Sequence, residues 1–116
     1  AVLLDAPCSG LGVLRRRADA RWRIDRDAPE RLGALAKRMA EAAVGLVRPG
    51  GVLVFSVCTL TAAESIAVDE HLAALHPQLV ALEAPTGPWR PWGRGAILLP
   101  QAADTDGMCL FRYRLE

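Results

Sequence analysis

Two cysteines occupy similar positions in the local sequence, and both could serve as nucleophiles. Cys8 stands in the segment DAPCSG (5–10), and Cys58 stands in SVCT (56–59). Each follows a short apolar run typical of a buried strand and precedes small polar residues typical of a turn. Open α/β sheets bind their ligands at the carboxyl ends of the strands. Both thiols are therefore predicted to face the same crevice.

A carboxylate stands close to the first of these thiols. Asp5 ends the first apolar run, two residues before the pair Pro7-Cys8, and when ionised it only accepts hydrogen bonds. It could bind donors of a ligand, or it could cap the loop by bonding backbone amides. Pro7 stiffens the approach to Cys8, while Ser9 and Gly10 allow the backbone to come close to a substrate.

Other interpretations of the cysteines remain open. Most free cysteines are small buried hydrophobic residues, and Cys109 is predicted to be one because it alternates with Phe111 and Tyr113 in a strand pattern. Cys8 and Cys58 could also form a redox pair if their strands are adjacent, although no Cys-x-x-Cys motif supports this.

Length and composition limit the class of protein. The chain has 116 residues, 52% of them hydrophobic, which predicts one globular domain or part of one. It begins directly with an apolar strand, so we expect the carboxyl-terminal part of a longer protein. No run is long enough to span a membrane, and three cysteines do not suggest a disulfide scaffold, so a cytoplasmic location is expected. No metal site is predicted, because His71 and His76 share no helical face and no cysteine lies near them.

The charge is unevenly distributed. The net charge is only +1, but residues 15–26 hold six arginines against two aspartates. This segment includes Arg15, Arg16, Arg21 and Trp22, and it suggests contact with phosphate or, equally well, an exposed solvated loop. The segment WRPWGR (89–94) carries a similar mixture and leaves the same two alternatives.

The pattern of apolar residues predicts the elements that position these side chains. We expect strands at 1–5, 51–56, 78–83 and 108–115, and helices at about 28–48 and 62–75. The first run is continuously apolar, as in a parallel strand that is covered on both faces. The last segment alternates, which favours an antiparallel strand.

Helix starts and chain topology follow from the same pattern. Asp27 and Thr61 are each followed three residues later by a glutamate, which predicts two capping boxes. A right-handed strand–helix–strand unit places the first two strands side by side, and the last strand is expected between the second and third. The fold class is therefore α/β, with a mostly parallel sheet and an antiparallel last strand.

Both cysteine motifs, in this order and about fifty residues apart, closely resemble motifs of the Sun/Nop-type (RsmB-like) RNA cytosine-5 methyltransferases. The resemblance covers nearly the whole chain and extends to GLG (10–12), Arg15-Arg16, Arg21-Trp22, RPGG (48–51) and TDG (105–107). It implies a partial class I (Rossmann-like) methyltransferase fold. Residues 1–116 would be the carboxyl-terminal half of this domain, without the amino-terminal half that binds cofactor.

The resemblance also implies a reaction. Cys58 would attack carbon 6 of a cytosine, carbon 5 would take a methyl group from S-adenosylmethionine, and Cys8 would assist product release. A helix start at Thr61 would favour the Cys58 thiolate by lowering its pKa. Asp5 is expected in the cofactor site. The substrate, RNA and by expectation ribosomal RNA, would be bound by Pro7, Ser9, Gly10, Arg15, Arg16, Arg21 and Trp22.

Several residues depart from the family pattern, namely Val57 before the nucleophile, Ser65 after the glutamate, and Met108-Cys109 after Asp-Gly. Two alternatives stay open. One is a DNA cytosine-5 methyltransferase with Cys8 as the nucleophile, and the other is a non-catalytic RNA-binding relative. Because a glycine-rich cofactor loop would precede Ala1, the chain alone is expected to bind S-adenosylmethionine weakly and to be inactive.

Overall fold

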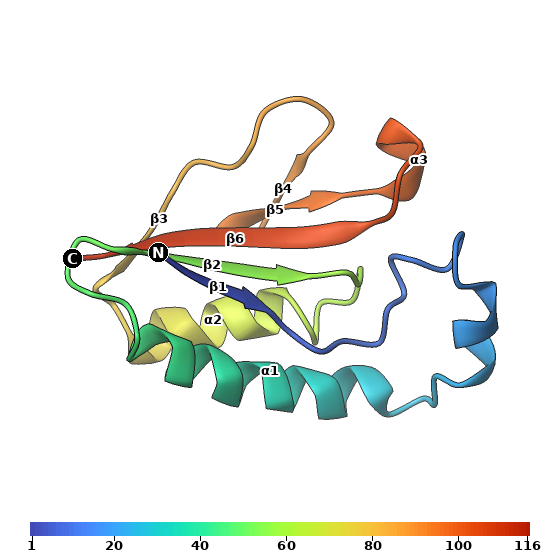
Figure 1. The fold of residues 1–116 in the computed structure, drawn as a ribbon, viewed down its shortest axis with the longest axis horizontal. Helices are drawn as coiled ribbons and strands as arrows, with labels where there is room; N and C mark the ends of the chain where they lie inside the picture. Colours follow the sequence, from blue (N-terminus) through green and yellow to red (C-terminus); the bar gives the residue numbers. More distant parts are fainter.

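A six-stranded mixed sheet with two helices against it forms the fold (Figure 1). The computed structural model describes residues 1–116. The strands are β1 Val2–Asp5, β2 Val52–Val57, β3 Leu79–Ala81, β4 Arg90–Trp92, β5 Gly95–Leu98 and β6 Met108–Leu115. The helices are α1 Ala28–Val44, α2 Ile66–Leu75, the short α3 Pro100–Ala103 and the 3-10 helix η1 Ala18–Trp22.

Four of the six strands run in the same direction. β1 pairs with β2 in parallel, and β6 pairs antiparallel with β2, β3 and β5, while β4 pairs antiparallel with β5. Strands β1, β2, β3 and β5 therefore share one direction. β6 lies between β2 and β3, as predicted, and the mixed α/β class with an antiparallel last strand is confirmed.

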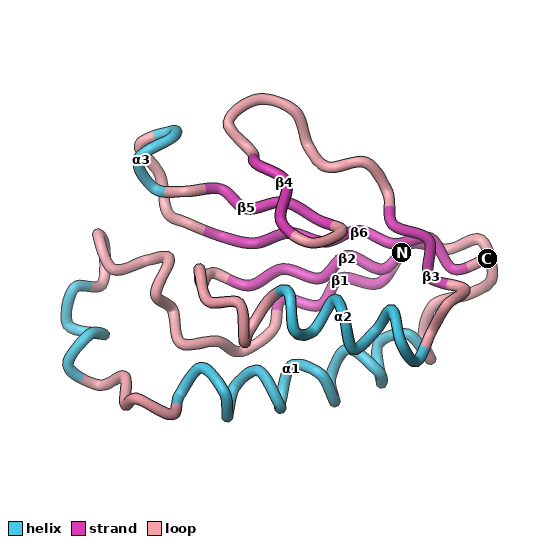
Figure 2. The backbone as a smooth tube through the Cα atoms, turned by 180° about the vertical axis from the view of Figure 1, so that it is seen from behind, coloured by secondary structure: helices cyan, strands magenta, loops and turns pink.

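Alternation along the two central strands builds the core. Alternate residues of β2 and of the first six residues of β6 are fully buried, namely Leu53, Phe55, Val57, Cys109, Phe111 and Tyr113. These side chains pack with Val68 and Leu72 of α2 in one cluster, which also holds small residues of α1. The rings of Phe55 and Phe111 stack with centroids 5.7 Å apart. Both helices lie side by side under the sheet, as the view from behind shows (Figure 2).

The predicted cover on both faces of the first strand is wrong for this chain. Leu4 is only 9% exposed and belongs to the core cluster, but its neighbour Leu3 is 70% exposed. β1 pairs with β2 alone, and no other element covers the face on which Leu3 lies. An apolar run therefore did not distinguish a strand buried on both faces from one buried on a single face.

Neither capping box is formed. α1 begins at Ala28, close to the prediction, but Asp27 makes no side-chain cap hydrogen bond. The helix ends at Val44, and tighter turns follow in which Val47 N–H donates to the Val44 carbonyl. α2 begins at Ile66, four residues later than predicted, because the Thr61 hydroxyl donates to the Glu64 carboxylate rather than to a helix amide.

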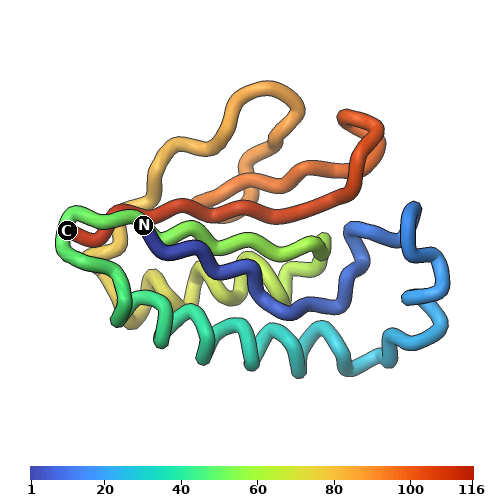
Figure 3. The backbone as a smooth tube through the Cα atoms, viewed as in Figure 1, coloured from blue at the N-terminus to red at the C-terminus, as the bar shows by residue number.

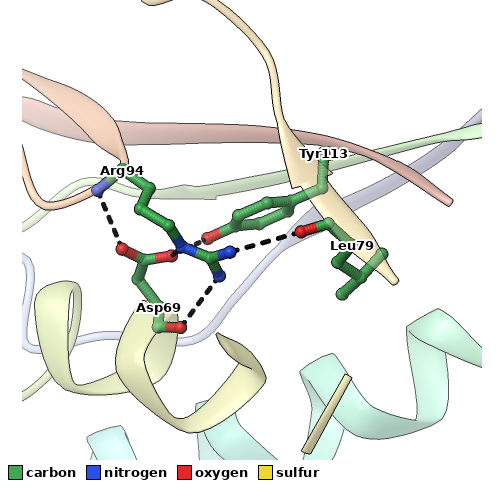
Figure 4. Close-up of polar contacts among 4 residues, drawn as sticks. All are labelled: Asp69, Leu79, Arg94 and Tyr113. Atoms are coloured by element: carbon green, nitrogen blue, oxygen red, sulfur yellow. Dashed lines mark hydrogen bonds and ion pairs between the residues drawn. The ribbon is translucent and has the colours of Figure 1, made fainter. Parts of the chain in front are cut away.

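The segment WRPWGR (89–94) contains β4, which pairs with β5 in an antiparallel hairpin. The Arg94 guanidinium and the Tyr113 hydroxyl both donate to Asp69 Oδ1, at 2.8 and 2.7 Å, and Arg94 Nη1 donates to the Leu79 carbonyl (Figure 4). Burial raises the pKa of Tyr113. Arg94 thus fixes the hairpin turn to α2, which favours the packed alternative for this segment over RNA contact.

The loops that carry the two cysteine motifs and the TDG turn gather at one end of the molecule. The chain that leaves β1, the chain that leaves β2 and the turn that enters β6 lie at the end opposite the two termini (Figure 3). Because β1 and β2 are parallel, their carboxyl ends reach this end together. Both cysteine motifs are therefore brought to the same edge of the sheet.

Candidate functional site

The two thiols of the cysteine motifs are in direct contact. Asp5 pairs with Ser56 at the last register position of β1 and β2, and the cysteines follow three and two residues later. The Sγ atoms of Cys8 and Cys58 lie 3.4 Å apart, at hydrogen-bonding distance, and both residues are half-buried. The structure thus brings together the pair that the sequence predicts at one crevice.

An open crevice of about 500 Å³ lies over these thiols. It is lined by Asp5, Ala6, Pro7, Cys8, Ser9, Gly10, Val13, Arg17, Ala20 and Cys58. The Asp5 carboxylate is exposed and accepts one hydrogen bond, from Ser56 Oγ at 3.3 Å, and it accepts none from a backbone amide. Its free oxygen can take a donor from a ligand, which favours the ligand-binding alternative over the loop cap.

The two thiols differ in their surroundings. Burial and, as a smaller contribution, the hydrogen bond with Cys58 together raise the pKa of the Cys8 thiol to about 12. Cys8 therefore keeps its proton at neutral pH and can donate it to the sulfur of Cys58. The expected helix start beside Cys58 is absent, since α2 begins only at Ile66, so the helix dipole does not explain an activated Cys58.

A buried carboxylate lies beneath the two motifs. Glu64 is fully buried, and its carboxylate accepts hydrogen bonds from the residue that follows each cysteine, Ser9 and Thr59. Sequence reasoning interpreted this residue as part of a capping box and missed its contact with the first motif. The local sequence around Glu64 does not indicate this contact, because Ser9 is 55 residues away in the chain.

Close backbone contacts link the first loop to the other two. Gly12 N–H donates to the Cys58 carbonyl at 3.0 Å, and Gly107 N–H donates to the Gly12 carbonyl at 2.7 Å. A Cβ atom at Gly12 would lie 2.1 Å from the Gly107 oxygen, so only glycine fits there. The TDG turn is thereby joined to both cysteine loops.

The predicted RNA-binding residues fall into two groups. Pro7, Ser9 and Gly10 line the crevice, but the arginine residues and the tryptophan of the set do not. Arg15 and Arg16 form ion pairs with Asp104 and Asp106, at 2.8 and 2.6 Å, in the turn before β6.

The two remaining residues of the set lie on the surface, where the Arg21 guanidinium stacks 4.9 Å from the ring of Trp22. Trp22 is 80% exposed. Arg17 does line the crevice and was not predicted, since nothing distinguishes it from its neighbours within the run of three arginines.

The structure contains no helix that combines the length and the apolar character of a membrane span. It also contains no group of three or more histidine, cysteine, aspartate or glutamate side chains placed to hold a metal ion.

Comparison with known proteins gives consistent matches. The family model described as 16S rRNA methyltransferase RsmB/F matches residues 1–114. Ribosomal RNA small subunit methyltransferase B of Thermus thermophilus is 44% identical over 77 residues, covering 66% of this chain and 19% of the relative. Ribosomal RNA small subunit methyltransferase F of Serratia proteamaculans is 36% identical over 124 residues, covering 98% of this chain and 25% of the relative.

A solved structure supports the same likeness. The crystal structure of NSun6 from Pyrococcus horikoshii with SFG aligns with a TM-score of 0.81 and 26% identity, covering 97% of this chain and 29% of that one. The chain therefore spans about a fifth to a quarter of the length of the two curated relatives described above.

Proposed function

The chain belongs to the RsmB/F family of 16S rRNA methyltransferases, as the resemblance to Sun/Nop-type enzymes predicted, and we propose that it carries the catalytic cysteines of an RNA cytosine-5 methyltransferase. The observation that carries this proposal is the contact between Cys8 and Cys58 at the carboxyl ends of two adjacent parallel strands. A base held in the crevice above them could meet both thiols.

S-adenosylmethionine is the cofactor of this family, and the P. horikoshii NSun6 was crystallised with SFG, an analogue of it. When bound, it supplies an electrophilic methyl group. The structure offers a fitting side chain in Asp5, whose exposed carboxylate has an oxygen free to accept from the hydroxyl or ammonium groups of the cofactor.

The two thiols have separate tasks in the proposed reaction. The Cys58 thiolate adds to carbon 6 of the cytosine, which raises the electron density at carbon 5 so that this carbon takes the methyl group. The proton on carbon 5 then passes to solvent water, the electron pair of that C–H bond re-forms the double bond between carbons 5 and 6, and the bond between Cys58 and carbon 6 breaks with its electron pair returning to sulfur. Cys8 assists this release.

The environment of the pair supports this assignment of roles. Cys8 keeps its proton because burial raises its pKa, and its thiol can donate a hydrogen bond to the sulfur of Cys58. A donor at this position stabilises the negative charge that develops on the sulfur of Cys58 as its bond to carbon 6 breaks. The reverse assignment, as in DNA cytosine-5 methyltransferases, would need the thiolate on Cys8, whose pKa is raised by burial.

The surface beside the crevice supports RNA as the substrate. Arg17 lines the crevice, and the stacked pair of Arg21 and Trp22 is exposed on η1. Single-stranded nucleic acid is bound by such combinations of positive charge and aromatic rings. Because the curated relatives are named ribosomal RNA methyltransferases, we propose a cytosine of ribosomal RNA as the target, in a reducing cytoplasm where both thiols stay free.

We further propose that residues 1–116 form the carboxyl-terminal half of the methyltransferase domain. The relatives are four to five times longer than the matched part, and the β1 edge and the Leu3 face are open in this chain. The half that binds most of the cofactor would cover them, so the chain alone is expected to be inactive.

Variants of the two cysteines test the proposed function in the full-length protein. Incubated with ribosomal RNA and S-adenosylmethionine, the Cys58→Ala variant should give neither methylated RNA nor a covalent RNA adduct. The Cys8→Ala variant should accumulate the adduct, because addition proceeds and release fails. Denaturing gel electrophoresis detects the adduct, and Cys109→Ser is the control, because it changes a cysteine outside the crevice and keeps a donor to the Thr59 carbonyl.

Two outcomes would contradict the proposal. An adduct that survives in Cys58→Ala and disappears in Cys8→Ala would assign the nucleophile to Cys8. Absence of both adduct and methyl transfer in the unmodified protein would favour a relative that binds RNA without turnover.

A further inference from the structure

We propose that Glu64 is a positioning residue that sets the separation of the two thiols, by binding the residue that follows each cysteine. The effect of Glu64 on catalysis rests on the proposed function, but its effect on the separation of the two thiols does not. Glu64 lies in the turn before α2 and is fully buried beneath the cysteine loops.

One side of the carboxylate holds the Cys8 loop. The backbone N–H of Ser9 donates to Oε1 at 2.5 Å, and the Ser9 hydroxyl donates to Oε2 at 2.7 Å. Hydrogen bonds to a charged acceptor are about twice as strong as neutral ones. Because Ser9 is joined directly to Cys8 and is itself buried, these two bonds limit how far the Cys8 thiol can move.

The other side of the carboxylate holds the Cys58 loop. The Thr59 hydroxyl donates to Oε2 at 2.9 Å, and the Thr61 hydroxyl donates to the same oxygen at 2.6 Å. Thr59 is fully buried and directly follows Cys58. The hydroxyls of Ser9 and Thr59 also lie 3.0 Å apart, so the two loops and the carboxylate form one connected network.

The network provides what a buried carboxylate needs. No arginine, lysine or histidine forms an ion pair with Glu64, and three hydroxyls and one amide surround its oxygens instead. A buried charge is costly unless it is hydrogen-bonded in this way. An apolar side chain could fill the same space at lower cost but could not bind both loops, so the carboxylate is suited to holding the loops in position.

The separation of the thiols matters for the proposed reaction because both act on one base. Cys58 must reach carbon 6 while Cys8 stays close enough to assist release. A displacement of about 1 Å in a reacting group costs roughly a hundredfold in rate. A side chain that binds residues adjacent to both thiols is therefore placed to control the chemical step without touching the base.

Disulfide formation measures the separation of the thiols without RNA or cofactor. Diamide oxidises two neighbouring thiols to a disulfide, and the two protons and two electrons that they lose reduce the diamide to a hydrazine. The sulfurs at 3.4 Å need little movement to reach bonding distance. In the full-length protein we expect Cys8 and Cys58 to cross-link rapidly, and we expect Glu64→Ala to slow this reaction at least about tenfold.

Matched variants separate positioning from simple loss of stability. Glu70→Gln, at an exposed position of α2, should cross-link at the unmodified rate. Glu64→Gln should give an intermediate rate, because its amide oxygen can still accept from Ser9 N–H while its NH2 group can donate to the hydroxyls. Circular dichroism and melting temperature establish which variants fold.

If Glu64→Ala does not fold, the double variant Ser9→Ala/Thr59→Val takes its place, since it removes two hydroxyl contacts and leaves the carboxylate. Slower cross-linking in either folded variant supports the proposal. An unchanged rate in a folded Glu64→Ala, or in the double variant when that is the one that folds, overturns it.

Methylation kinetics supply a second readout. We expect Glu64→Ala to lower kcat by roughly a hundredfold while the KM for RNA changes little, because Glu64 itself is fully buried and does not line the crevice. If the unmodified protein transfers no methyl group but Glu64 still controls cross-linking, the proposed function fails and the positioning role stands. If the unmodified protein methylates RNA but the cross-linking rate does not depend on Glu64, the proposed function stands and the positioning role fails.

Discussion

At the scale of single residues, the site contains two cysteine thiols whose surroundings differ. Cys8 and Cys58 have the same chemistry, but the pKa of Cys8 is raised to about 12 by burial and by the bond with Cys58. In the proposed reaction Cys58 must react as a thiolate, while Cys8 must remain protonated. Proximity at 3.4 Å supports this, because one sulfur can donate to the other.

The raised pKa of Cys8 predicts slow alkylation in the native state. At pH 8 its native thiolate fraction is far below that of an unfolded cysteine, so iodoacetamide should modify Cys8 at least about a hundredfold more slowly in native than in denatured protein. Peptide mapping by mass spectrometry measures both rates. Native protection should be lost as the pH rises from about 9 toward about 12, where the folded thiol ionises. Equal rates at pH 8 would show that Cys8 is not held as a thiol.

At the scale of elements, the site is an assembly of three loops rather than of strands. The strands β1 and β2 end side by side, and beyond them the chain is held by contacts between loops that are far apart in the sequence. Gly12 is central to this assembly, because its backbone bonds both the Cys58 carbonyl and Gly107 N–H.

Gly12→Ala should therefore damage the site from outside the crevice. The added Cβ would lie 2.1 Å from the Gly107 oxygen, and we expect a loss of about 1–3 kcal/mol in the free energy of unfolding, together with slower cross-linking of Cys8 to Cys58. Urea denaturation measures the first effect. Gly45→Ala is the control, since its Cβ would be 3.4 Å from the nearest atom and its φ is helical, so stability should change by less than about 1 kcal/mol. An unchanged free energy of unfolding in Gly12→Ala would contradict this prediction, because it would mean that the loops move apart to accommodate the added Cβ at little cost.

The elements also show which features local sequence could predict. Four strands, two helices and the place of β6 follow from apolar runs and alternation, which are properties of neighbouring residues. The meeting of the two thiols follows from parallel strands. The β4–β5 hairpin was missed because Pro91 and the glycines around it favour a loop, while Arg94 bonds to Asp69 and holds it in place. Glu64 was misassigned because its partners come from a distant loop.

At the scale of the whole molecule, the sheet is covered on one face only. α1 and α2 cover the face that carries Leu4, while Leu3 on the other face is exposed and β1 has a free edge. Open edges of this kind pair readily with other chains. The exposed strand is consistent with the proposal that this chain is half of a larger domain.

Expressed alone, residues 1–116 should self-associate through this strand. Leu3→Lys should reduce the association, because a lysine on an edge strand discourages pairing with a second copy. Sedimentation velocity over a range of concentrations measures it. Leu75→Lys, at an exposed helix position, is the control and should leave association unchanged. A monomeric unmodified chain would show that the edge is already protected.

The ion pairs of the arginine-rich loop also limit how strongly its charge can act. Arg15, Arg16 and Arg23 already contact aspartates, so a phosphate that binds them must displace a carboxylate. In such an exchange the phosphate releases a counterion but the freed carboxylate attracts one, so the net release is small. Three free arginines, rather than six, would set the dependence of RNA affinity on salt, with a logarithmic slope near about −2 instead of about −4. RNA affinity should therefore depend on salt concentration less strongly than the six arginines of this segment alone would predict.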